Sequence, residues 1–307
     1  MKSLVGKLLM VLSAALMATV ANAQQDPLYN QYLTNPMTVN PAYAGVHNRL
    51  SAGVNYRAQW TNLDDGPRTM TASGYSSFFK NMISGGLIVL QDQVSFVRNS
   101  EVYAVGAYKI SSPTYKLSFG LQAGVLNSRI DYSKLVLDPD NSDDPVFVPT
   151  NGSTKVNFGT GAVFTTDRLL LGVSVPRLSK SSLPRDSQGN TSYKRTAYLM
   201  GAFLVRIDEE TDLKPSVLIR AVEGVPLSYD LGMTWIGNRT FSFGLFTRNL
   251  DIFGALAGVK LQEKIQFNYT FEIPTNKSLG YQYGTHEISI RLDLKALPFQ
   301  EIEPTNF

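Results

Sequence analysis

From about residue 49 to residue 295, apolar and polar residues alternate with a period of two. Near the start of this region, Leu50, Val54 and Tyr56 fall in one set, whereas Asn55 and Arg57 fall in the other. Because successive side chains of a β-strand point to opposite faces, this pattern predicts strands with one apolar and one polar face. The same alternation returns in residues 115–125, 227–235, 264–272 and 287–295.

A water-soluble β-sandwich also alternates in this way, so three further features are needed to identify the surroundings of the sheet. Many segments reach the ~9–11 residues that a tilted strand needs to cross a bilayer. Aromatic residues of the apolar set stand near segment ends, as Tyr56, Trp60, Tyr115 and Trp235 do, where interfacial girdles are expected. The polar set is rich in glycine and in charges of both signs, which suits a lumen.

The lengths of the connections favour a membrane barrel over a secreted sandwich. Counting strands from residue 49 gives about fourteen, an even number, as in single-chain bacterial barrels. The even-numbered connections are short, whereas the long ones, over 127–154, 177–194 and 274–285, are all odd-numbered. We therefore expect an all-β protein: a transmembrane antiparallel up-and-down β-barrel of the outer-membrane type, spanning 46–296, with short turns in the periplasm and long loops outside.

The segments outside the alternating region support export. Residues 1–23 have basic Lys2 and Lys7, an apolar stretch from Leu8 to Val20 and the small residues Ala21 and Ala23, which is the pattern of a cleaved signal peptide rather than of a retained membrane helix. The chain has no cysteine, so neither disulfides nor thiolate metal sites are available. A net charge of +3 with scattered basic residues gives no indication of nucleic-acid binding.

Residues 24–45 show neither helical nor strand periodicity and contain Pro27, Pro36 and Pro41. Proline fixes φ and removes a backbone donor, and it pushes the preceding residue toward extended geometry. The sequence therefore predicts an extended arm, which either docks in the lumen as a plug or binds a periplasmic partner. The candidate contact residues are Tyr29, Asn30, Tyr32, Asn35, Pro36, Asn40, Pro41 and Tyr43.

Charged residues of the polar set are expected to face the lumen, where they either pair across the bore or line an open channel. They are Arg49, Arg57, Lys116, Lys214, Arg220, Asp230, Lys264, Glu272, Glu287, Arg291 and Asp293.

Motifs for catalysis or cofactor binding were not found, so neither an enzyme nor a cofactor is expected. Of the two histidines, His286 is interpreted as an interfacial residue of the last strand, and His47 has no evident catalytic partner. The acidic stretch 138–145 offers carboxylates for Ca²⁺, but without an EF-hand pattern it is better interpreted as a solvated loop.

Several motifs resemble those of the PorP/SprF family of Bacteroidetes outer-membrane proteins, and the resemblance covers essentially the whole mature chain. They are DPLYNQYLTNPMTVNPAYAG (26–45), YRAQW (56–60), GPRTMTASGYSSFF (66–79), LLLGVSVPRLS (169–179), LKPSVLIR (213–220), FGALAGVKL (253–261) and GTHEISIRLDL (284–294). One departure is YTFEIP (269–274), where the family often has a Tyr-Ser-Tyr-Asp type sequence.

The resemblance implies an integral outer-membrane component of the type IX secretion and gliding-motility apparatus, surrounded by outer-membrane lipid. It further implies support for the export or surface attachment of a specific cargo, such as an adhesin with a C-terminal secretion domain, and contact with periplasmic or lipoprotein parts of the machinery. The alternative is a general diffusion porin or small-solute transport barrel. Both termini are expected in the periplasm, including the short tail 297–307, in which Phe307 or Phe299 supplies a terminal aromatic residue.

Overall fold

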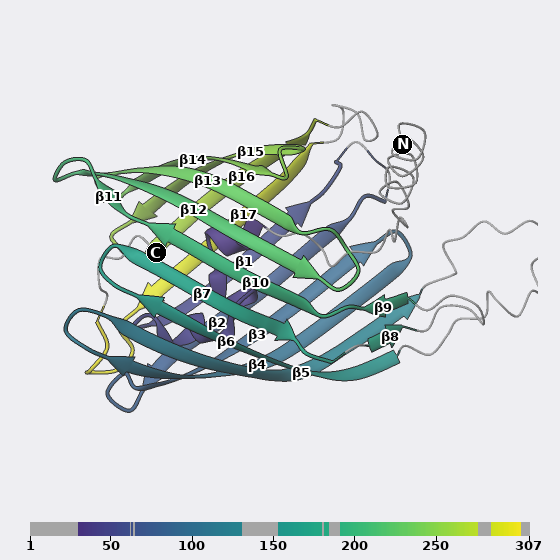
Figure 1. Ribbon diagram of the computed structural model, residues 1–307, viewed down its shortest axis with the longest axis horizontal. Coiled ribbons are helices and arrows are strands. Elements are labelled where there is room, and N and C mark those ends of the chain that lie inside the picture. Colours follow the sequence, from purple (N-terminus) through teal and green to yellow (C-terminus); the bar gives the residue numbers. More distant parts are fainter. Residues whose placement is uncertain are drawn as a thin grey trace, which may run out of the picture.

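The computed structural model describes residues 30–61, 63, 65–130, 153–179, 181–183, 191–275 and 284–301. Within these residues, fourteen strands form the wall of one barrel (Figure 1). They are β1 (Leu50–Ala58), β2 (Arg68–Phe78), β3 (Ile83–Val94), β4 (Val97–Ser111), β5 (Lys116–Ile130), β6 (Ser153–Thr165), β7 (Leu169–Arg177), β10 (Thr196–Phe203), β12 (Thr211–Val222), β13 (Ser228–Gly237), β14 (Phe241–Arg248), β15 (Ile252–Leu261), β16 (Ile265–Pro274) and β17 (Thr285–Leu294). No helix in these described ranges is both long enough and apolar enough to cross a membrane.

The sheet closes on itself because the first wall strand pairs with the last. Strand β1 pairs antiparallel with β17 from Leu50↔Leu294 to Ala58↔His286, and the other wall strands pair antiparallel with their neighbours in sequence. Strand β11 (Val205–Arg206) pairs with β12, and β8 (Ser181–Leu183) with β9 (Thr191–Tyr193) forms a separate ribbon between β7 and β10. The predicted up-and-down barrel of about fourteen strands is confirmed.

Burial follows the predicted period of two along the wall. In β4, Glu101, Tyr103, Val105 and Ala107 are buried in the interior, and the residues between them are exposed on the outside. The exposed set is strongly apolar: Leu121 is 68% exposed and Leu245 is 70% exposed. Such a surface is stable only against hydrocarbon, and closure satisfies the backbone hydrogen bonds that a free sheet edge would leave open in lipid.

The long connections all join strands at the same end of the barrel, as the sequence predicted. The turns 79–82, 112–115, 166–168, 238–240 and 262–264 and the connection 204–210 are short and lie at one end of the barrel, which we call the short-turn end. The longest connections, 131–152, 178–195 and 275–284, all join strand ends that lie at the opposite end, which we call the long-loop end. Asn238 and Arg239 both have positive φ, as the turns that match strand twist require.

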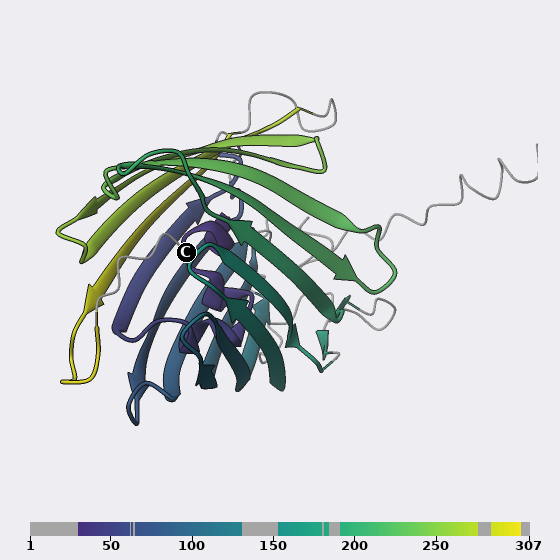
Figure 2. The same cartoon turned by 60° about the vertical axis from the view of Figure 1, so that its left-hand side comes forward.

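The arm ahead of β1 lies inside the barrel, where the views in Figures 1 and 2 show it in purple. Its described residues form three 3₁₀ helices, η1 (Asn30–Leu33), η2 (Pro36–Thr38) and η3 (Pro41–Gly45). The prediction of an extended arm is therefore wrong for these residues. Pro36 and Pro41 each begin a 3₁₀ helix, because their fixed φ suits a first helical position and the missing donor is not needed there.

In the described part of the arm, the residues before these two prolines keep extended or near-extended geometry. Asn35 has φ −143° and ψ 76°, and Asn40 has φ −142° and ψ 108°. The Asn40 side chain accepts a hydrogen bond from the Ala42 amide and so caps η3.

Candidate functional site in the barrel lumen

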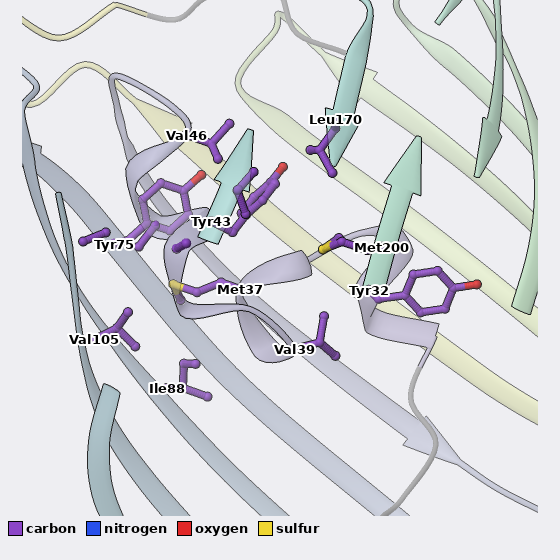
Figure 3. Close-up of a cluster of buried hydrophobic side chains, with 14 of the residues drawn as sticks. Tyr32, Met37, Val39, Tyr43, Val46, Tyr75, Ile88, Val105, Leu170 and Met200 are labelled. Carbon is purple, nitrogen blue, oxygen red and sulfur yellow. The ribbon is translucent and has the colours of Figure 1, made fainter. Parts of the chain in front are cut away.

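The main interior cluster joins the arm to the barrel wall (Figure 3). Met37 is 0% exposed and Tyr43 is 2% exposed, and Ala42 and Ala44 are also fully covered. These residues pack with wall side chains that include Tyr75, Ile88, Tyr103, Val105, Val163, Leu170 and Met200. The apolar area that a soluble domain would bury in its centre is thus buried here between arm and wall.

Glycines in the wall make room for the arm at the point of closest approach. A Cβ on Gly120 of β5 would lie 2.1 Å from the Ala42 nitrogen, and one on Gly161 of β6 would lie 2.2 Å from the Asn40 Oδ1. These two glycines are register partners on adjacent strands, and a Cβ on Gly172 of β7 would lie 3.0 Å from the Asn40 Nδ2. The first two distances are shorter than real Cβ contacts, so a side chain at Gly120 or Gly161 would collide with the arm.

Wall hydroxyl groups satisfy the arm's backbone carbonyls. Ser118 Oγ donates to the Ala42 carbonyl oxygen at 2.7 Å, and Ser174 Oγ donates to the Val39 carbonyl oxygen, also at 2.7 Å. In return, Asn40 Nδ2 donates to the wall carbonyl of Ala162 at 3.2 Å. Buried backbone groups need such partners, so these bonds fix both the position and the orientation of the arm.

The arm residues predicted either to dock in the lumen or to bind a partner lie mostly against the wall. Asn40, Pro41, Tyr43, Tyr32 and Pro36 are buried. Asn35 Nδ2 donates to Ser73 Oγ at 2.6 Å. Asn30 begins η1, and Tyr29 lies outside the described residues.

A chain of buried ion pairs crosses the wall toward the long-loop end. The Arg57 guanidinium lies 3.0 Å from Glu287 and also pairs with Glu272. Glu272 is 3.5 Å from Arg248, which in turn contacts Asp230 at 2.8 Å. These side chains come from β1, β17, β16, β14 and β13, so the charges predicted to face the lumen pair across neighbouring strands there.

Sequence reasoning missed some members of this interior set. Arg248 was not named, although it stands in the inward-facing register of β14 with Phe246, and extending the period of two would have found it. The pair Arg177–Glu101, at 2.8 Å, joins β7 to β4 and was also missed. The prediction that Lys264 faces the lumen is wrong, because this residue is exposed in the turn 262–264 that connects β15 to β16.

The other charged residues that were predicted to face the lumen are buried to different extents. Arg49 and Arg220 are buried, and Arg49 lies 3.2 Å from Asp293. Lys116, Lys214 and Arg291 are half-buried on inward-facing positions of β5, β12 and β17. Arg291 donates to the Thr34 carbonyl oxygen at 3.0 Å and so links the wall to the arm.

His47 lies between the arm and β1, where it is 2% exposed. Its Nε2 is 3.0 Å from the Tyr43 hydroxyl. Burial lowers the pKa of His47 well below its usual value, and the nearby cations Arg49, Arg291, Lys116 and Lys109 lower it further. His47 is therefore neutral in the folded barrel near pH 7.

The depressed pKa of His47 predicts a pH dependence of stability. Because the unfolded chain takes up this proton near pH 6.5, the free energy of unfolding should fall as pH decreases from about 7 to 5, by at most about 1.4 kcal/mol per pH unit. The His47→Gln variant should show a flatter dependence in this window. Denaturant unfolding of both proteins in detergent at several pH values measures the difference, and equal slopes would contradict the assignment.

Gln300, a residue that sequence reasoning also missed, anchors the C-terminal tail to β2 at the short-turn end. Gln300 is 0% exposed, and its Nε2 donates to Ser76 Oγ and the Ser77 carbonyl, both at 2.9 Å. Its Oε1 accepts from the Ala296 and Leu297 amides. The tail lacks the alternation of apolar and polar residues that identifies inward positions in the strands, so its sequence does not indicate that this glutamine is buried.

Replacing Gln300 with alanine should lower the free energy of unfolding by about 1–3 kcal/mol, because buried hydrogen-bonding groups lose their partner. The matched control is Gln91→Ala, whose side chain is exposed on β3 and whose loss should change little. Denaturant titrations of the two variants give the comparison, and equal effects would argue against an anchoring role for Gln300.

Among the described residues, no group of three or more histidine, aspartate or glutamate side chains could hold a metal ion. The acidic stretch 138–145, considered above as a Ca²⁺ ligand set, lies outside the described residues. His286 faces outward, and its Nδ1 is 2.7 Å from the Tyr269 hydroxyl on the neighbouring strand.

A closed antiparallel barrel with an apolar outer face and a polar, occupied interior is an outer-membrane β-barrel protein. A family model described as the type IX secretion system membrane protein PorP/SprF matches residues 21–292. The chain therefore belongs to the PorP/SprF family of type IX secretion membrane proteins.

No curated protein matches the sequence. Among solved structures, the outer membrane protein Omp33 of Acinetobacter baumannii has a TM-score of 0.49 at 9% identity, covering 81% of this chain and 100% of that one. A Pseudomonas aeruginosa FadL homologue has a TM-score of 0.48 at 12% identity, with 91% and 96% covered. The P. putida toluene transporter TodX has a TM-score of 0.48 at 9% identity, with 88% and 95% covered.

Proposed function

We propose that this protein is a non-enzymatic, plugged barrel of the type IX secretion system, which supports the export or surface attachment of a specific cargo protein such as an adhesin. Family membership supports the link to secretion. In this proposal the partners are the C-terminal domain of the cargo and periplasmic or lipoprotein components of the machinery. The chain then acts as a scaffold in the membrane.

The observation that carries the proposal is the packing of the arm in the lumen. Wall glycines lie directly against Pro41, Ala42 and the Asn40 side chain. Hydrogen bonds join Ala42 and Asn40 to the wall as well, so the arm is closely packed and specifically bonded there. A diffusion pore gains nothing from such a fit, because its function requires free water in the bore. The buried ion pairs from Arg57 to Asp230 occupy the interior side of strands β1, β13, β14, β16 and β17.

We further propose that the short-turn end faces the periplasm and the long-loop end faces outward, as is usual for outer-membrane barrels. The start of β1 and the end of β17 both lie at the short-turn end, and Glu301 donates its amide to the Asn48 carbonyl there. This orientation puts the tail on the periplasmic side, where lipoprotein components are accessible.

Two measurements on the full-length protein test the proposed function. Purified protein in planar bilayers should give no steady current, and a deletion strain should export less of its cargo to the cell surface while its uptake of small solutes is unchanged. Large steady pores combined with normal cargo display in the deletion strain would support the porin alternative and overturn the proposal.

A further inference from the structure

The C-terminal tail crosses the short-turn end of the barrel where β17 ends, β1 begins and β2 ends. The register of β1 with β2 ends at Ser51↔Tyr75, whereas β2 continues to Phe78. The last residues of β2 therefore extend past this ladder. The Gln300 side chain bonds to them there, so the tail contacts the edge of β2 next to the start of β1.

The same tail also bonds to the end of the arm. The Glu301 amide donates to the Asn48 carbonyl oxygen at 2.8 Å, and the Lys109 ammonium on β4 donates to the Asn48 side-chain oxygen. Asn48 stands between η3 and β1, so the arm would have to turn about this point to leave the lumen. The tail thus holds the arm at its pivot.

A further bond links the tail to the turn between β2 and β3. Asn81 Nδ2 donates to the Phe299 carbonyl oxygen at 2.6 Å, and Asn81 Oδ1 accepts from Ser77 Oγ at 2.7 Å. Phe79, Lys80 and Asn81 all have positive φ, a conformation that is strained for residues with a Cβ. The tail therefore stabilises a strained turn, and the turn in return fixes the tail.

Residues 296–301, which we call the strap, form a turn that is closed on itself. Gln300 Oε1 accepts from the Ala296 and Leu297 amides, and the Gln300 amide donates to the Leu297 carbonyl oxygen at 3.0 Å. Pro298 and Glu301 are exposed. Because the strap follows β17, which ends at Leu294, it can lift off the rim as one unit without opening a strand pair.

We propose that the strap is a release device for the plug. While the strap is bound, the arm cannot turn about Asn48, and detachment of the strap frees the arm to leave the lumen toward the short-turn end. Proteins open locally in cooperative units that are less stable than the whole fold, and a surface turn joined to both arm and wall is such a unit. The proposal builds on the plugged lumen described above and is independent of the secretion role.

Amide hydrogen exchange of the full-length protein in detergent, followed by mass spectrometry, tests the strap. The amides of Val39, Tyr43 and Val46 are hydrogen-bonded within the arm, so they report whether the arm stays docked. In Gln300→Ala their exchange should be about tenfold faster, which corresponds to the loss of one net hydrogen bond. The amides of β13–β15 should keep their rate. The exposed control Gln91→Ala should leave both rates unchanged.

Two truncations give a second test that does not depend on a buried substitution. Ending the chain after Lys295 removes the strap and leaves every wall strand intact, whereas ending it after Glu301 keeps the strap. The first truncation should accelerate exchange in the arm, and the second should not. Slow arm exchange in both Gln300→Ala and the shorter chain, or equal acceleration in the arm and β13–β15, would overturn the strap. Fast arm exchange in the unmodified protein would overturn the plug as well.

Discussion

Deletion of residues 24–44 should change the barrel from non-conducting to steadily conducting in planar bilayers. The arm fills the lumen with Met37, Tyr43 and their neighbours, whereas the wall strands are joined by their own backbone ladder. Removing the arm therefore opens the bore without removing any strand pairing. We expect the largest functional change of any single alteration here.

The deletion needs a check that the barrel still inserts. Heat-dependent mobility on gels and native sheet content by circular dichroism should be retained in the deletion protein. A correctly inserted deletion protein that remains silent in bilayers would show that wall side chains alone close the lumen, and the plug proposal would then be wrong.

The Gly120→Val variant should expel the arm while leaving its sequence intact. A Cβ at this position would lie 2.1 Å from the Ala42 nitrogen and 2.4 Å from the Pro41 carbonyl carbon, and a backbone so enclosed cannot shift by the required distance. We expect a loss of about 1–3 kcal/mol or more in the free energy of unfolding, together with the appearance of current.

Gly106→Val is the matched control for this variant. Gly106 is exposed on β4, and nothing lies within 4 Å of a Cβ built there. This substitution should leave both stability and conductance unchanged. Equal behaviour of the Gly120 and Gly106 variants would contradict the fitted contact between arm and wall.

The wall of the barrel could be predicted from the sequence because its strands obey one local rule. Lipid outside and a polar interior require strict alternation, so the inward positions of Arg57, Asp230 and Glu272 could be read directly. Arg248 follows the same rule. Lys264 departs from it, because the chain reverses at residues 262–264 and the alternation stops there.

The conformation of the arm and its contacts with the wall could not be predicted in the same way. Pro36 and Pro41 indicated extended residues before them, and this holds for Asn40, but the same prolines begin 3₁₀ turns that local pattern does not reveal. Gly120 and Gly161 lie side by side under the arm because the register of β5 with β6 pairs them, and the local sequence does not indicate that register. Gln300 is buried by contacts with β2 that no local signal in the tail indicates.

The measurement that tests the central claim most directly is thiol labelling of the arm in native membranes. The chain contains no cysteine, so Ala42→Cys introduces a single thiol at a position that is 0% exposed against the wall, and Thr61→Cys, in the connection between β1 and β2, provides an exposed control outside the hydrocarbon. Because the thiolate is the reactive form, a plugged lumen predicts that a maleimide reagent labels Thr61→Cys quickly and labels Ala42→Cys only after denaturation. Rapid labelling of Ala42→Cys in the folded, inserted barrel would contradict the account.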